Sequence, residues 1–219
     1  MATLGVIGGM GAKATAAFYT TLVEMQGNRT EQDYMDVIIY SKTSIPDRTA
    51  YILDNSKPNP APALIEAAKA LEKAGADFIA VACVTAHYFY EEIRTAVSIP
   101  VINVLTELAD FLVQKGIKTI GLLATTGTIQ SRLFHNVLEP LGIEIRTLPT
   151  EGQTKLMEII YDVKKGKPLE TFEFDSLASL LKTDAIVLGC TELSLLKQAH
   201  DIDVLDVLAM ASLKLGEAL

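Results

Sequence analysis

Cys83 and Cys190 are the residues whose type and setting could do chemistry in this chain. Each follows an apolar run and precedes a sequence able to begin a helix, "VTAHYFYEEI" in one case and "TELSLLKQA" in the other. Ligands of open α/β sheets bind beyond the carboxyl ends of the strands, so we expect both thiols at a ligand-binding edge. Backbone N–H groups and the helix dipole at such an edge favour a thiolate.

Other interpretations of the two cysteines stay open at this point. Cysteine is often fully buried, and at a strand end it can serve for packing alone. A disulfide or a redox role is a further alternative, which a reducing compartment disfavours. The matched positions favour acid–base chemistry, in which one thiol removes a proton from a carbon and the other delivers one to the opposite face. No metal site is expected, because the histidines and cysteines lack metal-ligand spacing.

Alternating apolar and amphipathic stretches predict βαβ units, and hence parallel sheets covered by helices. We expect helices over residues 13–26, 60–75 and 86–97. The strands of the first half are expected at 3–9, 36–41, 77–83 and 101–105, and those of the second half at 119–125, 143–148, 184–190 and 203–208.

The two halves of the chain align with one another in order. "TLGVIGGMGAKATAAF" from Thr3 matches "TIGLLATTGTIQSRLF" from Thr119, and residues 77–83 and 99–105 match 184–190 and 202–208. This predicts an α/β fold of two pseudo-symmetric domains of about a hundred residues each, with the active site in the cleft between them. The expected domains are 1–103, carrying Cys83, and 104–205, carrying Cys190. Residues 206–219 are a candidate to return and pack on the first domain.

Composition narrows the range of partners and compartments. The 27 acidic and 19 basic residues give a net charge of −8, which argues against nucleic acid and anionic membranes as partners. The start, "MATLGVIGGMGAK", lacks the basic region of a signal peptide and predicts a first strand. No apolar run reaches the roughly 18 residues that span a bilayer, so we expect a cytoplasmic protein.

The chain resembles the aspartate/glutamate racemase family, whose members are amino-acid racemases that work without pyridoxal phosphate. The matching stretches are "GVIGGMG", "IIYSKTSIPDRT", "AGADFIAVACVTAH", "GLLATTGT", "MEIIYDVKKGK" and "VLGCTEL". The resemblance implies two α/β domains, no cofactor, a small acidic amino acid as substrate (aspartate before glutamate), and a homodimer. It also implies that Cys83 and Cys190 form a thiolate/thiol pair, one taking the Cα proton and the other protonating the carbanion.

The resemblance assigns substrate carboxylates to two cations. Arg48, in "IPDRT", matches a carboxylate-binding position that suits a guanidinium fork, and Lys164 matches a second such position. Without the resemblance, Arg48 could equally be an ion-pair partner of Asp47, and Lys164 a solvated member of "KKGK".

Several polar groups next to these motifs are further candidates for the site. Gly9 and Met10 lie in the loop after the first strand, where backbone N–H groups can approach a ligand. The hydroxyls of Thr85, Thr125 and Thr191 could bind the substrate carboxylate or ammonium, or could cap the next helix.

Two further residues lie close to the cysteines in sequence. His87 could pair with the Cys83 thiolate, or could be a buried hydrogen-bonding residue. Glu192 could orient a proton carrier, or could simply favour a helix N-terminus.

At two positions the chain departs from the family pattern. Val84 stands where an Asn that contacts substrate is usual, and valine can neither donate nor accept a hydrogen bond. Lys42 stands where Asn is common and adds a cation. These changes leave open an isomerase of another carboxylate such as maleate, a hydantoin racemase, or a non-catalytic amino-acid-binding relative.

Overall fold

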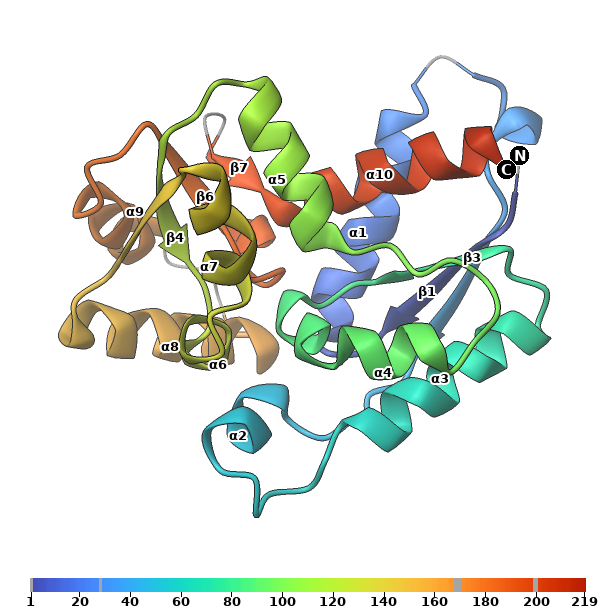
Figure 1. Cartoon of the computed structure of the whole chain (residues 1–219), viewed down its shortest axis with the longest axis horizontal. Helices are drawn as coiled ribbons and strands as arrows, with labels where there is room; N and C mark the ends of the chain where they lie inside the picture. The colour runs from blue at the N-terminus through green and yellow to red at the C-terminus, as the bar shows by residue number, and fades with distance from the viewer. Residues whose placement is uncertain (1, 28, 168–170, 199–200) are drawn as a thin grey trace.

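Parallel strand pairing builds a separate sheet from each half of the chain. The structure is a computed structural model that describes residues 2–27, 29–167, 171–198 and 201–219, and within these ranges it contains two parallel sheets. Helices flank both sheets, and the sheets lie side by side (Figure 1). The predicted α/β fold with two parallel sheets is therefore confirmed.

The strand order is the same in both sheets. The first sheet has the order β2-β1-β3, and the second has the order β5-β4-β6-β7. An isolated parallel bridge from Val101 to Ile79 stands where β7 pairs with β6 in the second sheet. The strands are β1 (Leu4–Gly8), β2 (Val37–Ser41), β3 (Phe78–Val81), β4 (Thr119–Leu123), β5 (Glu144–Thr147), β6 (Ala185–Leu188) and β7 (Ile202–Asp203).

Amphipathic helices cover the sheets. In α5, for example, Leu105, Leu108, Ala109 and Leu112 are buried at the spacing of a single helix face. None of the described helices is both long and apolar enough to cross a membrane. The helices are α1 (Ala12–Met25), η1 (Glu31–Asp33), α2 (Arg48–Leu53), α3 (Ala61–Lys73), η2 (Val84–Phe89), α4 (Tyr90–Thr95), α5 (Val104–Gln114), α6 (Thr126–Gln130), α7 (Leu133–Leu138), η3 (Glu139–Leu141), α8 (Thr150–Lys164), α9 (Thr171–Ser179), η4 (Leu193–Leu196) and α10 (Val204–Ala218), where η marks a 3₁₀ helix.

The aligned residues of the two halves make the same contacts. The Asp77 carboxylate accepts a hydrogen bond from the backbone N–H of Thr3 at 2.6 Å, and Asp184 accepts one from Thr119 at 2.9 Å. In both halves the aspartate directly precedes the third strand. The threonine is next to or at the first residue of the first strand, since Thr3 precedes β1 and Thr119 begins β4. The alignment found in the sequence therefore corresponds to a repeated arrangement of strands.

The internal alignment makes α5 the last helix of the first repeat and α10 the last helix of the second, and in this sense each half extends past the expected boundary at residue 103. Each of these last helices packs on the other half. Helix α5 contacts α7, α10 contacts α1, and the two last helices contact one another (Figure 1). Apolar residues of both halves form one continuous buried cluster around them, including Phe18 of α1, Phe134 of α7, Leu108 of α5 and Leu208 of α10. This packing fixes how the two sheets sit relative to one another.

Two expected strands pair only at their start, through the Val101 bridge and β7, and then give way to helices. The runs 101–105 and 203–208 were expected to be strands, but helices begin at Val104 and at Val204. The Asn103 side chain accepts a hydrogen bond from Leu105 N at 3.1 Å, and Asp203 accepts one from Leu205 N at 2.9 Å. These caps start the helices. The expected helix 86–97 likewise begins earlier, as the 3₁₀ helix η2 followed by α4.

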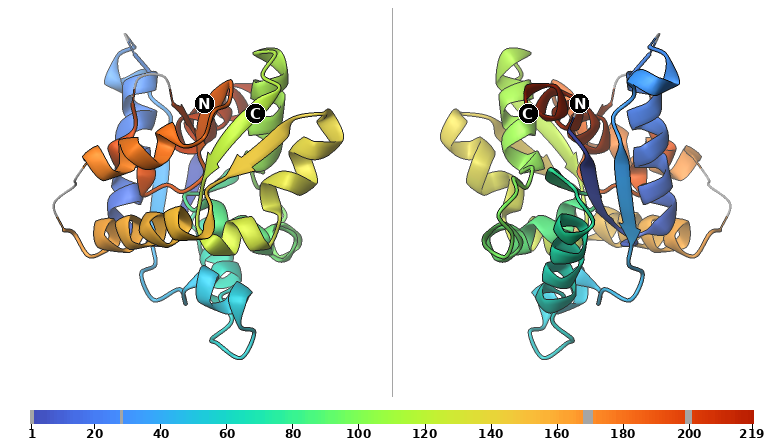
Figure 2. Two further views of the ribbon diagram at one scale, coloured as in Figure 1. Left: turned by 90° about the vertical axis from the view of Figure 1, so that its left-hand side faces the viewer. Right: turned by 90° about the vertical axis from the view of Figure 1, so that its right-hand side faces the viewer.

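We expect Gly127→Ala to destabilise the contact between the halves. Gly127 lies in α6, which packs against α2 of the other half (Figure 2), and a Cβ at this position would lie 2.9 Å from Thr49 Cα. Because that atom is backbone, relief needs a shift of a whole segment. The free energy of unfolding should fall by about 1 to 3 kcal/mol in urea denaturation.

Gly152→Ala is the matched control. Gly152 lies in α8, and a Cβ there meets nothing closer than 3.4 Å. Alanine should leave the free energy of unfolding unchanged or raise it by about 0.5 to 1 kcal/mol, since glycine is a poor helix former. Equal losses in both variants would contradict the account of Gly127.

The cap of α10 should make stability depend on pH. Burial raises the pKa of Asp203 from 3.8 to about 6. The folded protein therefore holds this proton more tightly than the unfolded chain, so its contribution to stability is complete below about pH 4 and is lost as the pH rises through about 6. We expect Asp203→Asn, which keeps a capping oxygen, to be more stable than the wild type at pH 7.5 by about 1 to 3 kcal/mol.

Urea denaturation of wild type and variant from pH 5 to 8 measures this difference. Asp206→Asn is the control, because Asp206 binds the same Lys197 but caps nothing. The control should flatten the slope of stability against pH much less than Asp203→Asn does, because the Asp206 charge raises the pKa of Asp203 less than burial does. Parallel curves for Asp203→Asn and the wild type would refute the prediction.

Candidate functional site

Both cysteines lie just past the carboxyl ends of corresponding strands. Cys83 follows β3 and Cys190 follows β6. Cys83 is 6% exposed and Cys190 is 4% exposed. Both are free thiols, so this structure contains no disulfide between them. Each cysteine also belongs to the apolar cluster on the outer face of its own sheet. Each cysteine is therefore both buried among apolar residues and placed at the carboxyl end of a strand, so the packing and ligand-site interpretations do not exclude one another.

The surroundings of Cys190 favour its thiol form. Its Sγ donates a hydrogen bond to Glu192 Oε2 at 3.0 Å. Burial raises the pKa of Cys190 well above the ordinary value of a thiol, and the Glu192 carboxylate raises it further. Lys164 acts in the opposite direction but does not outweigh them. The buried carboxylate in contact with this thiol, which the sequence pattern did not reveal, acts against the effect of a helix dipole.

Lys164 connects the charged groups of the two halves. It is the last residue of α8, its Nζ lies 4.0 Å from Glu192 Oε1, and its side chain is 22% exposed. Burial by itself would lower the pKa of Lys164, but interactions with Glu192, Cys190 and Cys83 outweigh that effect and raise it. Arg48 acts on the same ammonium. The Lys164 ammonium thus interacts with both cysteines and with Arg48, which is the other predicted carboxylate-binding cation.

Arg48 is a buried cation at the start of α2. Its guanidinium donates to the carbonyl oxygens of Ile45 at 3.3 Å, Pro46 at 2.7 Å and Met10 at 3.0 Å, and the residue is 6% exposed. Among the described residues it forms no ion pair with a carboxylate, and its buried Nε has no hydrogen-bond partner. Asp47 does not pair with it and instead caps α2 through Ala50 N at 2.8 Å. The structure therefore provides a positive charge that none of the described carboxylates neutralises.

Three threonine hydroxyls meet at the boundary between the halves. Thr85 lies in η2, and Thr125 and Thr128 come from the start of α6. Each pair of Oγ1 atoms is 3.0 Å apart, and all three residues are buried. The Thr125 hydroxyl also accepts a hydrogen bond from Thr128 N at 3.2 Å. Thr125 therefore caps α6, which is one of the two roles predicted for it. This group joins the cysteine-bearing turn of one half to the other half.

Thr191 and Glu192 carry buried polar atoms without hydrogen-bond partners. These atoms are Thr191 Oγ1 and Glu192 Oε1, and both residues are 3% exposed. Gly11, in the loop after β1, leaves room for this carboxylate, because a Cβ there would lie 2.7 Å from Glu192 Oε1. Since buried polar groups are almost always paired in proteins, unpaired ones are typical of a site that takes a ligand.

His87 bonds to the main chain through both ring nitrogens. Nδ1 donates to the carbonyl oxygen of Cys83 at 3.1 Å, and Nε2 accepts from Val104 N at 3.4 Å. Burial lowers the pKa of His87, which keeps the ring neutral, as these two bonds require. The histidine thus connects the turn after Cys83 to the first residue of α5, and it makes no bond to the Cys83 sulfur.

The remaining predicted residues lie around this group. Gly9 has φ +87°, and a Cβ there would lie 2.5 Å from the Lys42 backbone, so only glycine fits. Met10 contributes its carbonyl to Arg48. Val84 lies in the apolar cluster shared by the halves. The Lys42 ammonium is paired with Glu66 at 2.9 Å and lies near the Tyr40 hydroxyl at 3.5 Å.

Sequence reasoning missed two further residues of the site, Thr128 and Tyr161. The Lys164 ammonium lies 5.3 Å from the centre of the Tyr161 ring, and burial raises the pKa of Tyr161, with nearby Asp47 acting in the same direction. The spacing of three residues between Tyr161 and Lys164 on one helix face was a usable signal. Thr128 similarly stands three residues after Thr125, the spacing of a helix cap.

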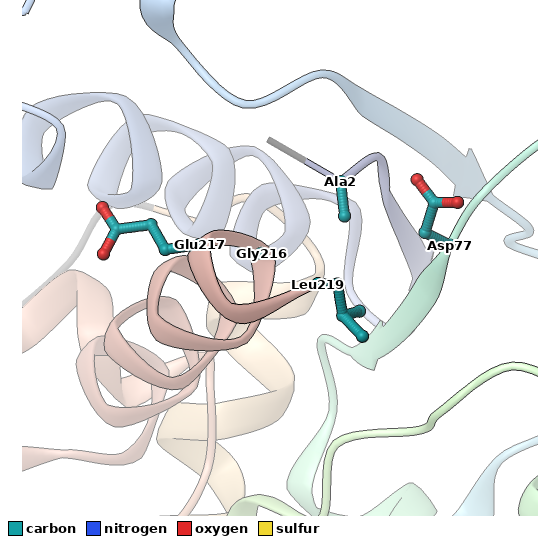
Figure 3. Close-up of a pocket in the computed structure, with 5 residues that line it drawn as sticks. All are labelled: Ala2, Asp77, Gly216, Glu217 and Leu219. Carbon is teal, nitrogen blue, oxygen red and sulfur yellow. The ribbon is translucent and has the colours of Figure 1, made fainter.

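A pocket of about 670 Å³ lies at the amino ends of the strands of the first sheet (Figure 3). Its lining includes Ala2 and Asp77, which precede β1 and β3, whereas Cys83 follows β3. This pocket is therefore remote from the cysteines. In the described part of the chain, no group of three or more His, Cys, Asp or Glu residues is placed to hold a metal ion.

Comparison with known proteins gives consistent matches. The family profile described as Asp/Glu/Hydantoin racemase matches residues 7–213. A broad specificity amino-acid racemase of Bacillus subtilis (strain 168) is 29% identical over 199 residues, which is 87% of this chain and 86% of that protein. A glutamate racemase of Shewanella woodyi is 31% identical over 127 residues, 56% of this chain and 47% of that protein.

A solved structure agrees over nearly the whole length. The Picrophilus torridus aspartate racemase superposes with a TM-score of 0.91 at 27% identity, covering 99% of this chain and 95% of that one. Together with the family match, this confirms the resemblance found in the sequence motifs. The chain therefore belongs to the Asp/Glu/Hydantoin racemase family, and it is an isomerase, an amino-acid racemase of the kind that acts without pyridoxal phosphate.

Proposed function

We propose that the chain interconverts the L and D forms of aspartate or glutamate by two-base proton transfer between Cys83 and Cys190. The observation that carries this proposal is the position of Lys164, whose ammonium lies 4.0 Å from Glu192 Oε1, while the other oxygen of Glu192 bonds to Cys190 Sγ. The same ammonium is within electrostatic range of Cys83 and Arg48. Proton exchange at the Cα of an amino acid with two carboxylates needs two thiols and two cations in reach of one another.

The two cations suit a substrate with two carboxylates. Arg48 is buried and has a free Nε, and Lys164 has one carboxylate neighbour at the limit of ion-pair distance. A guanidinium binds a carboxylate in bidentate fashion, whereas an ammonium acts as a point charge. We place aspartate first because an aspartate racemase matches 99% of the chain. The broad specificity of the Bacillus relative makes glutamate and other amino acids the next to test.

The proposed chemistry is a proton exchange at Cα. A thiolate removes the Cα proton, and the electron pair of the C–H bond stays on carbon as a carbanion. The thiol on the opposite side then donates its proton to the other face, so the first sulfur ends as a thiol and the second as a thiolate. Buried positive charge from Arg48 and Lys164 would stabilise the carbanion and its carboxylate, because a site with little water strengthens such interactions.

The two departures from the family pattern fit this proposal. Val84 packs in the apolar cluster and Lys42 is paired with Glu66, so we assign neither side chain a direct contact with substrate. The hydroxyl of Thr191, which has no partner, is the group we assign to the substrate instead.

A homodimer and a cytoplasmic location stay predictions from the sequence. Size-exclusion chromatography with light scattering measures the first, and fractionation of the source cell measures the second.

We expect the protein to place deuterium at Cα and to form the opposite enantiomer when given either enantiomer of aspartate in D₂O. Proton NMR with chiral analysis of the product measures both. Cys83→Ala and Cys190→Ala should each lower racemisation by about 10²- to 10⁴-fold, the usual contribution of a positioned acid or base. Each variant should still exchange the Cα proton of one enantiomer only, and the two variants should act on opposite enantiomers.

The outcomes of this experiment separate the alternatives. No exchange with aspartate or glutamate in a folded wild type would favour another carboxylate such as maleate, or a non-catalytic binding protein. Full racemisation by either cysteine variant would refute the two-base mechanism.

We expect Arg48→Lys to weaken substrate binding more than it disturbs the fold. Lysine keeps the charge but loses the guanidinium fork, so KM for aspartate should rise by about 10- to 100-fold. Arg94→Lys is the control, because Arg94 is half exposed and pairs with Glu91. Steady-state kinetics and the rise in Tm that succinate produces measure the two effects. An unchanged KM together with an unchanged succinate shift would contradict the role of Arg48.

A further inference from the structure

The two cysteines are equivalent in the fold but differ in the residue two positions later. Cys83 is followed at that position by Thr85, and Cys190 by Glu192. The Thr85 hydroxyl is neutral and bonds to Thr125 and Thr128. Glu192 brings an acidic side chain, 3% exposed, into direct contact with Cys190. The duplicated scaffold therefore carries an asymmetric pair of thiol environments.

The contact between Cys190 and Glu192 needs a proton on sulfur. A carboxylate can only accept, so the 3.0 Å bond from Sγ to Oε2 exists when the thiol is protonated. A thiolate there would place two negative charges 3.0 Å apart in a buried setting, which strongly disfavours ionisation of one of them. Lys164 Nζ lies 4.0 Å from the other carboxylate oxygen, so a positive charge stands beside this contact.

Cys83 has different neighbours. Among the described residues, no carboxylate contacts its sulfur, and the nearby His87 ring bonds to its backbone oxygen and stays neutral. The charged groups that act on the Cys190 thiol are Glu192, which is negative, and Lys164 from α8, which is positive. Lys164 also interacts with Cys83 and with Arg48 from α2. Among the described residues, the Cys83 sulfur therefore lacks the carboxylate contact that Cys190 has.

We propose that Glu192 keeps the proton on Cys190 in the ligand-free protein, so that Cys83 is the base and Cys190 the acid when a turnover begins. The proposal rests on the proposed two-base reaction and deepens it. Cys83 takes the Cα proton and becomes a thiol. Cys190 gives its proton to the opposite face and becomes a thiolate beside Glu192, from which state it regains a proton from water while Cys83 releases one. Glu192 is a positioning residue in this scheme, because it acts through Cys190.

NMR titration of single-cysteine proteins tests the assignment without relying on activity. Cysteine labelled with ¹³C at Cβ reports the thiolate directly. In Cys83→Ala, where only Cys190 remains, the thiolate should form at higher pH than in Cys190→Ala, where only Cys83 remains. At a pH below both midpoints, the thiolate fraction of Cys190 should be at least about tenfold smaller, which corresponds to one pH unit.

Removing the charge at position 192 should reverse the effect. Adding Glu192→Gln to Cys83→Ala should raise the thiolate fraction of Cys190 by about tenfold or more at pH 8, because the amide carries no charge. Glu192→Asp keeps the charge and should stay closer to the parent. Glu91→Gln is the control, since the Glu91 side chain is 68% exposed, and it should change nothing. Circular dichroism verifies that each variant is folded.

Two results would overturn the inference. One is an unchanged Cys190 titration in Glu192→Gln, and the other is a Cys83 thiolate that forms only at higher pH than that of Cys190. The test is separate from that of the proposed function. Racemisation by the wild type without any effect of Glu192→Gln overturns only this inference, whereas unequal thiols in a protein that racemises nothing overturn only the proposed function.

Discussion

The exchange of last helices between the halves is the constraint on which the site depends. Helix α5 packs on α7, α10 packs on α1, the two last helices pack on one another, and one apolar cluster runs through all of them. Because the sheets are attached to this cluster, the carboxyl ends of β3 and β6 cannot shift independently. The cysteine-bearing turns inherit that fixed relation, and the threonine hydroxyls at the boundary reinforce it.

The site buries charge that the fold only partly neutralises. Arg48 is satisfied by main-chain oxygens and has no carboxylate partner among the described residues, and the Lys164–Glu192 distance of 4.0 Å is long for an ion pair. Burying such groups costs free energy that packing elsewhere must offset. In exchange, the positive charges are already oriented before a ligand arrives, which is the arrangement that stabilises an anionic transition state.

The places of the site residues in the fold were easier to predict from the sequence than the contacts that their side chains make. Apolar runs followed by helix-forming sequence placed Cys83 and Cys190 at strand edges, and the internal alignment anticipated the shared strand order. The same apolar pattern misled at residues 203–208, where the Asp203 cap turns a strand-like run into α10. Spacing also could not reveal that Lys42 pairs with Glu66, or that Glu192 reaches back to Cys190. Such contacts depend on side-chain direction, which short motifs do not specify.

The exchanged helices also bear on how the chain folds as it is made. On the ribosome, α1 emerges early, but the apolar face that Phe18 and Leu22 present is completed by α10, near the end of the sequence. Until then this side of the N-terminal half lacks part of its cover, although the cluster on the outer face of the same sheet uses only residues 7–101. Contacts of such large sequence separation slow folding and leave apolar surface exposed during synthesis. The shared cluster between the halves can therefore be completed only after α10 has been made.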